Sequence, residues 1–387
     1  MRRILVAGGG IAGSAAALAL DKAGFEVAVY EAHPETGEDI GAFLTLASNG
    51  MLALAQIGAA RAVAETGFPL TSTRVADDRG AEVAVIPLGD HEDPLLRYRC
   101  LRWAELCRVL QAEVRRRGIP VHHGKRVVSV EEDAGGVIAR FADGDRARAD
   151  LLVGADGLNS AVRTVIDPGA PPPRYAGQRV FYGYTAAAKP PSAPGRMEMI
   201  RGGAAAFGYA VSPRGETSWF ARVPGEPLPD EEIAAGAPAG WRDLLVPLLR
   251  RDATPAADIV ASTGDDLMVT NARDLPEVRR WRTGRAVLIG DAAHAASPAT
   301  GQGASMAVED AVVLAKALRD LGTLDEALRA YEAVRRPRTQ ANIAASARMT
   351  RRIPGRDDPP PSGGTGGEDA LARQLAWDEP LTAVLPA

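Results

Sequence analysis

The first thirty residues alternate between apolar runs and glycines. Residues 4–7 form a short, wholly apolar run, which is typical of a strand buried on both faces of a sheet. A glycine-rich turn follows, and the alanine-rich stretch 11–23 then predicts a helix that ends at Gly24. The next apolar run, residues 26–30, leads into Glu31. The pattern therefore predicts a strand, a helix and a second, parallel strand.

The succession of an apolar run, a turn and a helix recurs twice. Residues 150–163 read DLLVGADGLNSAVR, and residues 286–304 read AVLIGDAAHAASPATGQGA. In each segment an aspartate, Asp156 or Asp291, stands just after the predicted strand. Open α/β sheets bind ligands at the carboxyl ends of their strands. Three such strand ends can therefore converge on one extended ligand.

Strand-like segments of another kind interrupt this rhythm. Residues 72–87 and 179–223 contain short apolar runs separated by turn residues, for example at 212–216. This pattern indicates an antiparallel meander. We therefore expect an α/β fold in which a parallel, Rossmann-like sheet carries an inserted, mostly antiparallel sheet.

Composition and charge narrow the class of protein. The 387 residues are 46% hydrophobic and 24% charged, as in ordinary globular proteins, and the net charge of −4 argues against a non-specific nucleic-acid binder or a membrane clamp. Arg2 and Arg3 precede an uncharged run, residues 4–20, as in a signal peptide, but three glycines break that run. Cys100 and Cys107 form no metal-binding pattern. We expect a cytoplasmic protein, a monomer or homodimer, without a metal site, nucleic acid or membrane as partner.

The first turn carries a dinucleotide-binding pattern. Gly8, Gly10 and Gly13 form G-x-G-x-x-G between a strand and a helix, and Glu31 follows Gly13 by 18 residues. The glycines permit a tight turn, close approach of a pyrophosphate and close packing of helix on strand, and an acid about 20 residues later binds a ribose hydroxyl. The alternative is a glycine-rich packing turn with a solvated Glu31. NAD and FAD share this fingerprint, so these residues leave the dinucleotide open.

The three motifs together resemble the p-hydroxybenzoate hydroxylase-like, single-component (class A) FAD monooxygenases. That family carries a dinucleotide fingerprint, a DG motif (here GADGLNSAVR, residues 154–163) and a GD motif (here GDAAHAASPATGQG, residues 290–303) in this order. The resemblance spans about residues 2–338. It implies FAD as cofactor and a Rossmann-like FAD-binding domain with an inserted, mostly antiparallel substrate domain.

By the resemblance, one group of residues would hold the adenosine diphosphate half of FAD. This group comprises Gly8, Gly10, Ala12 and Gly13 at the pyrophosphate, Glu31 at the ribose and the backbone of Val127 at adenine. Ala32 departs from the arginine that many relatives place after the ribose acid, which removes one adenosine contact.

A second group would hold the flavin half. It comprises Arg102 at the pyrophosphate and ribityl chain, Asp156 near both FAD and the nicotinamide, Asp291 at a ribityl hydroxyl, and the backbone of Gly303 and Ala304 at the pyrimidine edge. The helix that begins at Gly303 would stabilise negative charge on reduced flavin by ~0.3–2 kcal/mol.

The resemblance also implies the chemistry. Only one fingerprint is present, so NAD(P)H would bind transiently as electron donor. Reduced flavin would react with O2 to a C4a-hydroperoxide, which hydroxylates the substrate, and the backbone of Pro298 would line the oxygen pocket. The flavin carries this reaction, so the pattern names no catalytic base. For His294 we expect a structural role, with the ring hydrogen-bonded to backbone.

The expected domains are discontinuous. Residues 1–70, 97–170 and 276–350 would form the FAD-binding domain, and residues 71–96 and 171–275 the substrate-binding domain. Residues 351–387 would form a flexible tail with a short terminal segment, around residues 371–377, that docks on the body. Pro337 predicts a kink or break in the last long helix.

Aromatic residues of the inserted sheet are the candidates for the substrate pocket. They are Tyr182, Tyr184, Phe207, Tyr209 and Trp219, and the alternative for each is the core of the sheet. Few charged positions of this region can be placed in a pocket, which favours a neutral, rather apolar substrate.

These inferences favour an FAD-dependent monooxygenase that uses NAD(P)H and O2 to hydroxylate an aromatic or other electron-rich small molecule, in secondary metabolism or aromatic catabolism. An FAD-dependent epoxidase or reductase on a similar scaffold is one alternative. A non-catalytic protein that binds flavin or another ligand is an alternative of a different class.

Overall fold

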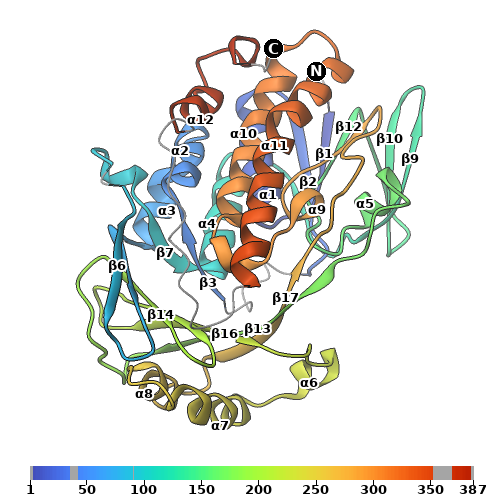
Figure 1. Cartoon of the computed structure of the whole chain (residues 1–387). Coiled ribbons are helices and arrows are strands. Elements are labelled where there is room, and N and C mark those ends of the chain that lie inside the picture. The colour runs from blue at the N-terminus through green and yellow to red at the C-terminus, as the bar shows by residue number, and fades with distance from the viewer. Residues whose placement is uncertain (1–2, 35–41, 90, 352–367, 385–387) are drawn as a thin grey trace.

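A five-stranded parallel sheet, in the order β18-β12-β1-β2-β8, forms the centre of the larger body of the molecule (Figure 1). The computed structural model describes residues 3–34, 42–89, 91–351 and 368–384. The strands of this sheet are β1 (Arg3–Ala7), β2 (Glu26–Tyr30), β8 (Val121–His122), β12 (Leu151–Gly154) and β18 (Ala286–Leu288). The predicted β-α-β unit is therefore present, with α1 at Ile11–Lys22 between β1 and β2.

Helix α1 packs against α10 (Gly303–Asp320) and α4 (Trp103–Arg116). Many of its buried side chains are alanines, and residues 15–20 are all 0% exposed. Small side chains let the neighbouring helix come close, so the start of α10 is brought beside the glycine-rich turn that precedes α1. These helices and the parallel sheet share one apolar core.

Two small antiparallel sheets border the parallel one. The first has the order β11-β10-β9, and the second has the order β3-β7-β4. Their strands are β9 (Val127–Asp133), β10 (Gly136–Phe141), β11 (Arg146–Ala149), β3 (Phe43–Leu46), β7 (Arg99–Arg102) and β4 (Phe68–Pro69). The remaining short helices of the body are α2 (Ser48–Gln56), α3 (Ala60–Thr66), α5 (Ala161–Ile166) and α9 (Asp291–His294).

A seven-stranded sheet in the order β17-β13-β16-β15-β14-β5-β6 forms the second layer. All its neighbours pair antiparallel except β14 and β5. The strands are β5 (Ser72–Ala76), β6 (Glu82–Pro87), β13 (Arg174–Thr185), β14 (Arg196–Arg201), β15 (Ala206–Val211), β16 (Thr217–Pro224) and β17 (Leu267–Asp274). The expected meander is confirmed, and the expected mixed fold with it.

Helices cover the outer face of this sheet, away from the parallel sheet (Figure 1). They are α7 (Pro238–Leu249) and α8 (Ala256–Ala261), with the short α6 (Asp230–Ala235) before them. The inner face of the sheet turns towards the larger body, where Phe43 of β3 packs against it. The seven-stranded sheet is thus covered on both faces.

The last long helix, α11, runs from Leu324 to Thr350 and continues through Pro337, so the expected break is wrong. The missing N–H of a proline removes one helical hydrogen bond. Tertiary bonds on either side hold the helix in place, because Arg336 donates to the carbonyl oxygen of Val278 and Arg338 to the Glu309 carboxylate, each at 2.8 Å. No helix in the described ranges is both long and apolar enough to cross a membrane.

The terminal segment docks on the body, as expected from its apolar residues. Helix α12 (Glu368–Leu375) packs on α2 and α10, and the Trp377 ring lies between Lys22 and Arg319, 4.5 and 4.7 Å from its centroid. The buried Lys316 donates to the carbonyl oxygens of Gln374 and Ala376, at 2.7 and 2.5 Å. The segment expected to be a flexible linker lies mostly outside the described residues.

Candidate active site

The three motifs begin on the same side of the parallel sheet, where the carboxyl ends of its strands lie. Strands β18, β12 and β1 are neighbours, and each motif follows the carboxyl end of its strand. Backbone bonds join these ends: Ala155 N donates to Ala7 O at 2.8 Å, and Ile289 N to Gly154 O at 3.0 Å. Residues that are about 150 positions apart in the sequence therefore form one site.

In the glycine turn, the backbone geometry requires glycine at Gly8 and Gly13, whereas Gly10 leaves open space beside the backbone. A Cβ at Gly13 would lie 1.9 Å from the carbonyl oxygen of Gly8, and Gly8 itself has a φ of +102°. A Cβ at Gly10 would meet nothing within 4 Å. Gly10 also caps α1 without a side chain, so the positive end of the helix dipole is open to a ligand there. This open space fits a pyrophosphate.

Glu31 lies beside this turn at the end of β2. Its carboxylate accepts hydrogen bonds from the backbone N–H of Gly9 at 2.5 Å and of His33 at 2.8 Å. A carboxylate offers about four lone-pair positions, so acceptor capacity remains for a ribose hydroxyl. Gln111 of α4 donates to the carbonyl oxygen of Gly9 at 2.8 Å and thereby stabilises the turn. The sequence did not indicate this role.

Asp156 of the DG motif binds the start of α5. Its carboxylate accepts from Ser160 Oγ at 2.5 Å, Ala161 N at 2.8 Å and Val162 N at 3.1 Å. Burial raises the pKa of Asp156, and these hydrogen bonds oppose that rise. In this arrangement the aspartate fixes the turn of the motif.

Arg163, at the end of the same motif, connects it to the GD motif. Its guanidinium donates to the carbonyl oxygen of Ala292 at 3.1 Å and to that of Leu158 at 2.7 Å. The side chain is buried, and burial lowers its pKa. An arginine seven residues beyond the DG aspartate was a visible signal, but its partner in the remote helix α9 was not.

Asp291 of the GD motif has an open carboxylate. The residue is exposed to solvent and makes no hydrogen bond to any described residue, yet the protein around it restricts hydration and raises its pKa. A solvent-accessible carboxylate with free acceptor positions fits a ligand hydroxyl. Gly290 brings the motif against the glycine turn, because a Cβ at this position would lie 2.8 Å from the Ala12 side chain.

The loop after the GD motif leads into α10. Pro298 and Gly303 are exposed, Ala304 is partly buried, and Gly303 is the first residue of this 18-residue helix. A Cβ at Gly301 would lie 3.0 Å from Thr45 Oγ1, so the loop lies against β3. The loop before α10 thus lies beside β3, whose Phe43 packs against the inner face of the seven-stranded sheet.

A network of buried charged side chains holds the GD motif in place through hydrogen bonds and ion pairs. Asp310 of α10 accepts from Gly290 N at 2.8 Å, pairs with His294 Nε2 at 2.5 Å and accepts from Arg335 Nε at 2.7 Å. The Arg335 guanidinium also pairs with Glu309 at 2.7 Å. His294 is therefore structural, as expected, but its ring partner is a carboxylate and the expected backbone partner is wrong.

The chain is similar to a known family of proteins over most of its length. A family model described as an FAD binding domain matches residues 1–346. The chain belongs to this family. The family is that of the p-hydroxybenzoate hydroxylase-like flavin monooxygenases, so the resemblance seen in the motifs is confirmed, as are FAD as cofactor and monooxygenase as the class of enzyme.

Similar proteins cover most of this monooxygenase. An aurachin C monooxygenase/isomerase from Stigmatella aurantiaca is 33% identical over 89% of this chain and 88% of its own length. A 3-amino-4-hydroxybenzoate 2-monooxygenase from Streptomyces cremeus is 35% identical over 87% and 84%. The crystal structure of Klebsiella pneumoniae HpxO complexed with FAD and uric acid is 28% identical, with a TM-score of 0.80 over 99% of this chain and 95% of that one.

The aromatic residues that were candidates for the substrate pocket of the monooxygenase lie on opposite faces of the seven-stranded sheet. Tyr182 and Tyr184 lie on the inner face with Phe43, at ring-centroid distances of 6.2 and 6.4 Å. The other three candidates, Phe207, Tyr209 and Trp219, lie on the outer face in the core under α7 and α8. Their packing there fits the alternative, the core of the sheet, and a role of these three in the pocket stays a prediction. Alternation along a strand groups side chains by face but does not say which face meets the ligand.

This placement predicts different effects for two aromatic substitutions. Trp219 Nε1 donates to Thr263 Oγ1 at 2.9 Å inside the outer core. Trp219→Phe should therefore lower the free energy of unfolding by about 1–2 kcal/mol and leave substrate affinity unchanged. Tyr182→Phe, on the inner face, should alter substrate affinity with little loss of stability. Urea titration and steady-state kinetics of both variants measure this, and a Trp219→Phe variant that changes only KM would refute the placement.

Arg102 is directed towards the substrate sheet. Its Nη2 donates to Glu216 at 3.0 Å, and its guanidinium carbon lies 3.7 Å from the centroid of the Tyr184 ring. No described contact tests its expected role at FAD, so this role stays a prediction. The same holds for Val127, which is buried at the start of β9.

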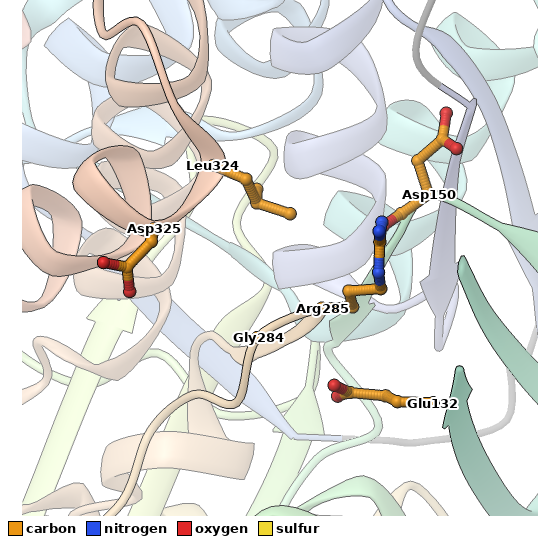
Figure 2. A pocket seen from close by; sticks show the side chains of 6 residues that line it. All are labelled: Glu132, Asp150, Gly284, Arg285, Leu324 and Asp325. Atoms are coloured by element: carbon orange, nitrogen blue, oxygen red, sulfur yellow. The ribbon is translucent and has the colours of Figure 1, made fainter. Parts of the chain in front are cut away.

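A surface hollow of about 510 Å³ lies away from these residues (Figure 2). It is lined by Glu132, Asp150, Gly284, Arg285, Leu324 and Asp325. Asp150 and Arg285 precede β12 and β18, so the hollow lies at the amino ends of the strands, whereas the motifs follow the carboxyl ends. Arg285 donates to the carbonyl oxygens of Asp150 and Ala134, each at 3.2 Å, and so has structural partners. The hollow takes no part in the candidate active site.

Proposed function

We propose that this monooxygenase uses NAD(P)H and O2 to hydroxylate an aromatic or other electron-rich small molecule. The observation that carries the proposal is that the glycine turn and the GD motif follow neighbouring strands, and that the loop between the GD motif and α10 lies against β3, whose Phe43 packs on the aromatic inner face of the seven-stranded sheet. FAD, when bound, supplies hydride acceptance and the activation of O2. The relatives named for 3-amino-4-hydroxybenzoate and urate support a planar aromatic or heteroaromatic substrate.

The residues of the chain would bind and orient the reactants. Gly10 and the start of α1 would receive the pyrophosphate, Glu31 the ribose and Asp291 a ribityl hydroxyl. The amino terminus of α10, at Gly303 and Ala304, would stabilise negative charge on the reduced ring system. The backbone near Pro298 would line the place where O2 reacts.

The inner face would exclude water from the reaction. Phe43, Tyr182, Tyr184 and Phe220 form an apolar cluster there. A dry site strengthens the electrostatic effect of the helix terminus and protects reactive species from water. Asp156 would remain the anchor of the DG turn, near the path of the nicotinamide.

The test begins with the absorbance spectrum of the purified protein. We expect flavin bands that NADH or NADPH bleaches under anaerobic conditions, and faster bleaching when an aromatic substrate is present. With ¹⁸O2, one labelled oxygen atom should enter the product. Reduction without label in the product would favour a reductase, label in an oxirane an epoxidase, and bound FAD that neither nicotinamide reduces a non-catalytic flavin protein.

Removal of the Asp291 carboxylate should weaken FAD binding specifically. Asp291 is open and unpaired among the described residues, so Asp291→Ala costs the apoprotein no internal contact. A charge-assisted hydrogen bond contributes about 1.5–3 kcal/mol, so FAD affinity should fall roughly tenfold to a hundredfold. Fluorescence titration of the apoprotein with FAD measures the loss. An unchanged affinity would show that Asp291 does not contact the cofactor.

A further inference from the structure

The carboxyl end of helix α11 connects the seven-stranded sheet with the loop that follows the GD motif. The helix packs against strand β13 of the sheet and against η2 (Pro298–Thr300), a short 3₁₀ helix in that loop. In Figure 1 the end of α11 reaches down to the sheet. The helix therefore contacts both the strand that carries Tyr182 and the segment that contains Pro298.

Gln178 makes the connection on the side of the sheet. It pairs with β16 in the same regular register as Tyr182, four residues further on, so both side chains lie on the inner face. Between Tyr175 and Arg179 the register of β13 against β17 is irregular, and such a bulge re-aims side chains. The Gln178 side chain is buried, and its Nε2 donates to the carbonyl oxygen of Thr350 at 2.9 Å.

Three buried hydroxyl groups make the connection on the side of the loop. Ser297 Oγ lies 2.7 Å from Thr350 Oγ1 and 2.8 Å from Ser346 Oγ. Ser346 Oγ also donates to the carbonyl oxygen of Ser297, which immediately precedes Pro298. The exposed fractions of Ser297, Ser346 and Thr350 are 3%, 0% and 7%. Two hydroxyls that are one helical turn apart thus bind a single serine of the loop.

These contacts define one relative position of the loop and the sheet. A buried polar group is costly unless it is hydrogen-bonded, and a hydrogen bond weakens steeply when its distance or angle changes. Apolar contacts are not directional and would allow the two surfaces to shift. A backbone bond from Leu275 N to Ala295 O, at 2.9 Å, joins the same loop to the end of β17. The name α11 joint is used below for Gln178, Ser297, Ser346 and Thr350.

We propose that the α11 joint is a set of positioning residues that hold the backbone at Pro298 at a fixed distance from the inner face of the seven-stranded sheet. This inference rests on the proposed function, in which O2 reacts near that backbone and the substrate lies at that face. A misplacement of about 1 Å between reacting groups can lower a rate about a hundredfold. The joint therefore determines how much of the NAD(P)H consumed leads to hydroxylated product.

The first test follows hydrogen–deuterium exchange of the protein as purified, without added substrate. Gln178→Met keeps the length of the side chain and removes the donor to Thr350. The amides of residues 295–302 should then exchange at least about fivefold faster, the factor equivalent to about 1 kcal/mol for one lost hydrogen bond. Because Gln178 belongs to the sheet, faster exchange in the loop would show that the joint holds it. Unchanged exchange of this segment would overturn the inference.

Asn271→Leu is the matched control for this variant. Asn271 is a buried amide on β17 that donates to the carbonyl oxygen of Leu228 at 2.7 Å and accepts from its N–H at 3.0 Å. The control should lower the melting temperature and leave the exchange of residues 295–302 as in the wild type. An equal rise in loop exchange in both variants would indicate a general loss of stability and would contradict the proposal.

Substitutions at Thr350 test the joint from the side of the loop. Thr350→Val keeps the shape of the side chain and removes the hydroxyl that contacts Ser297, so residues 295–302 should exchange faster, as in Gln178→Met. Thr350→Ser keeps the hydroxyl and should stay close to the wild type. If the valine and serine variants exchange alike, the hydroxyl does not hold the loop and the inference fails.

The second test measures how NAD(P)H consumption divides between product and peroxide. Two electrons that do not serve hydroxylation reduce one O2, with two protons, to hydrogen peroxide. The probe is 3-amino-4-hydroxybenzoate or urate, whichever accelerates bleaching of the wild-type flavin more. Product formed per NAD(P)H oxidised should fall by about half or more in Gln178→Met and Thr350→Val, with a matching rise in peroxide. It should stay unchanged in Asn271→Leu. An unchanged product yield in both joint variants would remove the joint from the reaction.

Failure of the inference can be told apart from failure of the proposed function. If the wild type holds no flavin, or if no nicotinamide reduces it, the proposed function fails. If the wild type hydroxylates the probe but the joint variants keep both loop exchange and product yield, only the joint fails. If neither probe accelerates bleaching, the exchange experiment decides on the joint by itself.

Discussion

Replacement of Gly10 by alanine should reduce FAD affinity by a factor of about 100 or more while the apoprotein stays folded. A Cβ at Gly10 meets no protein atom within 4 Å, and the φ of −71° is accessible to alanine, so the fold tolerates the change. The added methyl group would occupy the space through which the pyrophosphate approaches the backbone. A loss of about 2.7 kcal/mol corresponds to this factor.

Two other glycines provide matched controls for this prediction. Gly13→Ala places a Cβ 1.9 Å from the Gly8 carbonyl oxygen and should impair folding itself. Gly240→Ala, on an exposed turn of α7 with nothing within 4 Å, should leave FAD binding unchanged and stabilise the protein slightly. FAD titration and thermal melting of the three apoproteins separate these outcomes. Retention of wild-type FAD affinity by Gly10→Ala would mean that the pyrophosphate lies elsewhere.

Replacement of Asp310 by asparagine should lower the free energy of unfolding by about 3–5 kcal/mol, because it leaves the buried Arg335 without one of its two carboxylate partners. The carboxylate also orders His294 and Gly290, so the GD loop should loosen and FAD should bind more weakly. Guanidinium chloride titration measures the stability. Asp258→Asn, which removes an exposed pair with Arg250, should cost at most about 1 kcal/mol.

The same substitution should change the acid limb of the stability profile. The paired histidine and arginine overcome the effect of burial and hold the pKa of Asp310 at about 2 in the folded chain, against about 3.9 in the unfolded chain. A lowered carboxyl pKa stabilises the fold fully above about pH 4, and this contribution disappears as the pH falls towards 2. Asp310→Asn should therefore flatten the profile in this window. An equally steep acid limb in both proteins would assign it to other groups.

The sequence predicted that the three motifs meet at the carboxyl ends of neighbouring strands, because the features on which this prediction depends are local. Glycine spacing at Gly8, Gly10 and Gly13 determines the backbone course of one turn, and the turn is specific to one kind of ligand. Asp291 was identified for the same reason, since it follows directly on a strand whose direction the apolar run had already given. Such features depend on a few neighbouring residues and on the order of strands in one sheet.

The substrate side could not be predicted in the same way. Both faces of the seven-stranded sheet are covered, so the apolar character of Phe207 and Trp219 fitted either face, and only the packing of α7 and α8 decides between them. The partner of His294 lies 16 residues away on another helix, and the Arg335 that balances it lies on a third. Helix α11 continues through Pro337, where it is bonded to remote segments of the chain. Local helix propensity does not include such bonds.

The residues of the candidate cofactor site are synthesised at widely separated times. The glycine turn is translated near the beginning, whereas the start of α10 follows at residue 303 and Arg335 later still. At about 5–20 residues per second, roughly 15–60 s separate the synthesis of the two ends of the cofactor site. During this time β12 lacks its neighbour β18, so the nascent parallel sheet has an open edge. We therefore expect flavin to be held only after the start of α10 has been synthesised, and a truncated product that ends before α10 should not hold the cofactor.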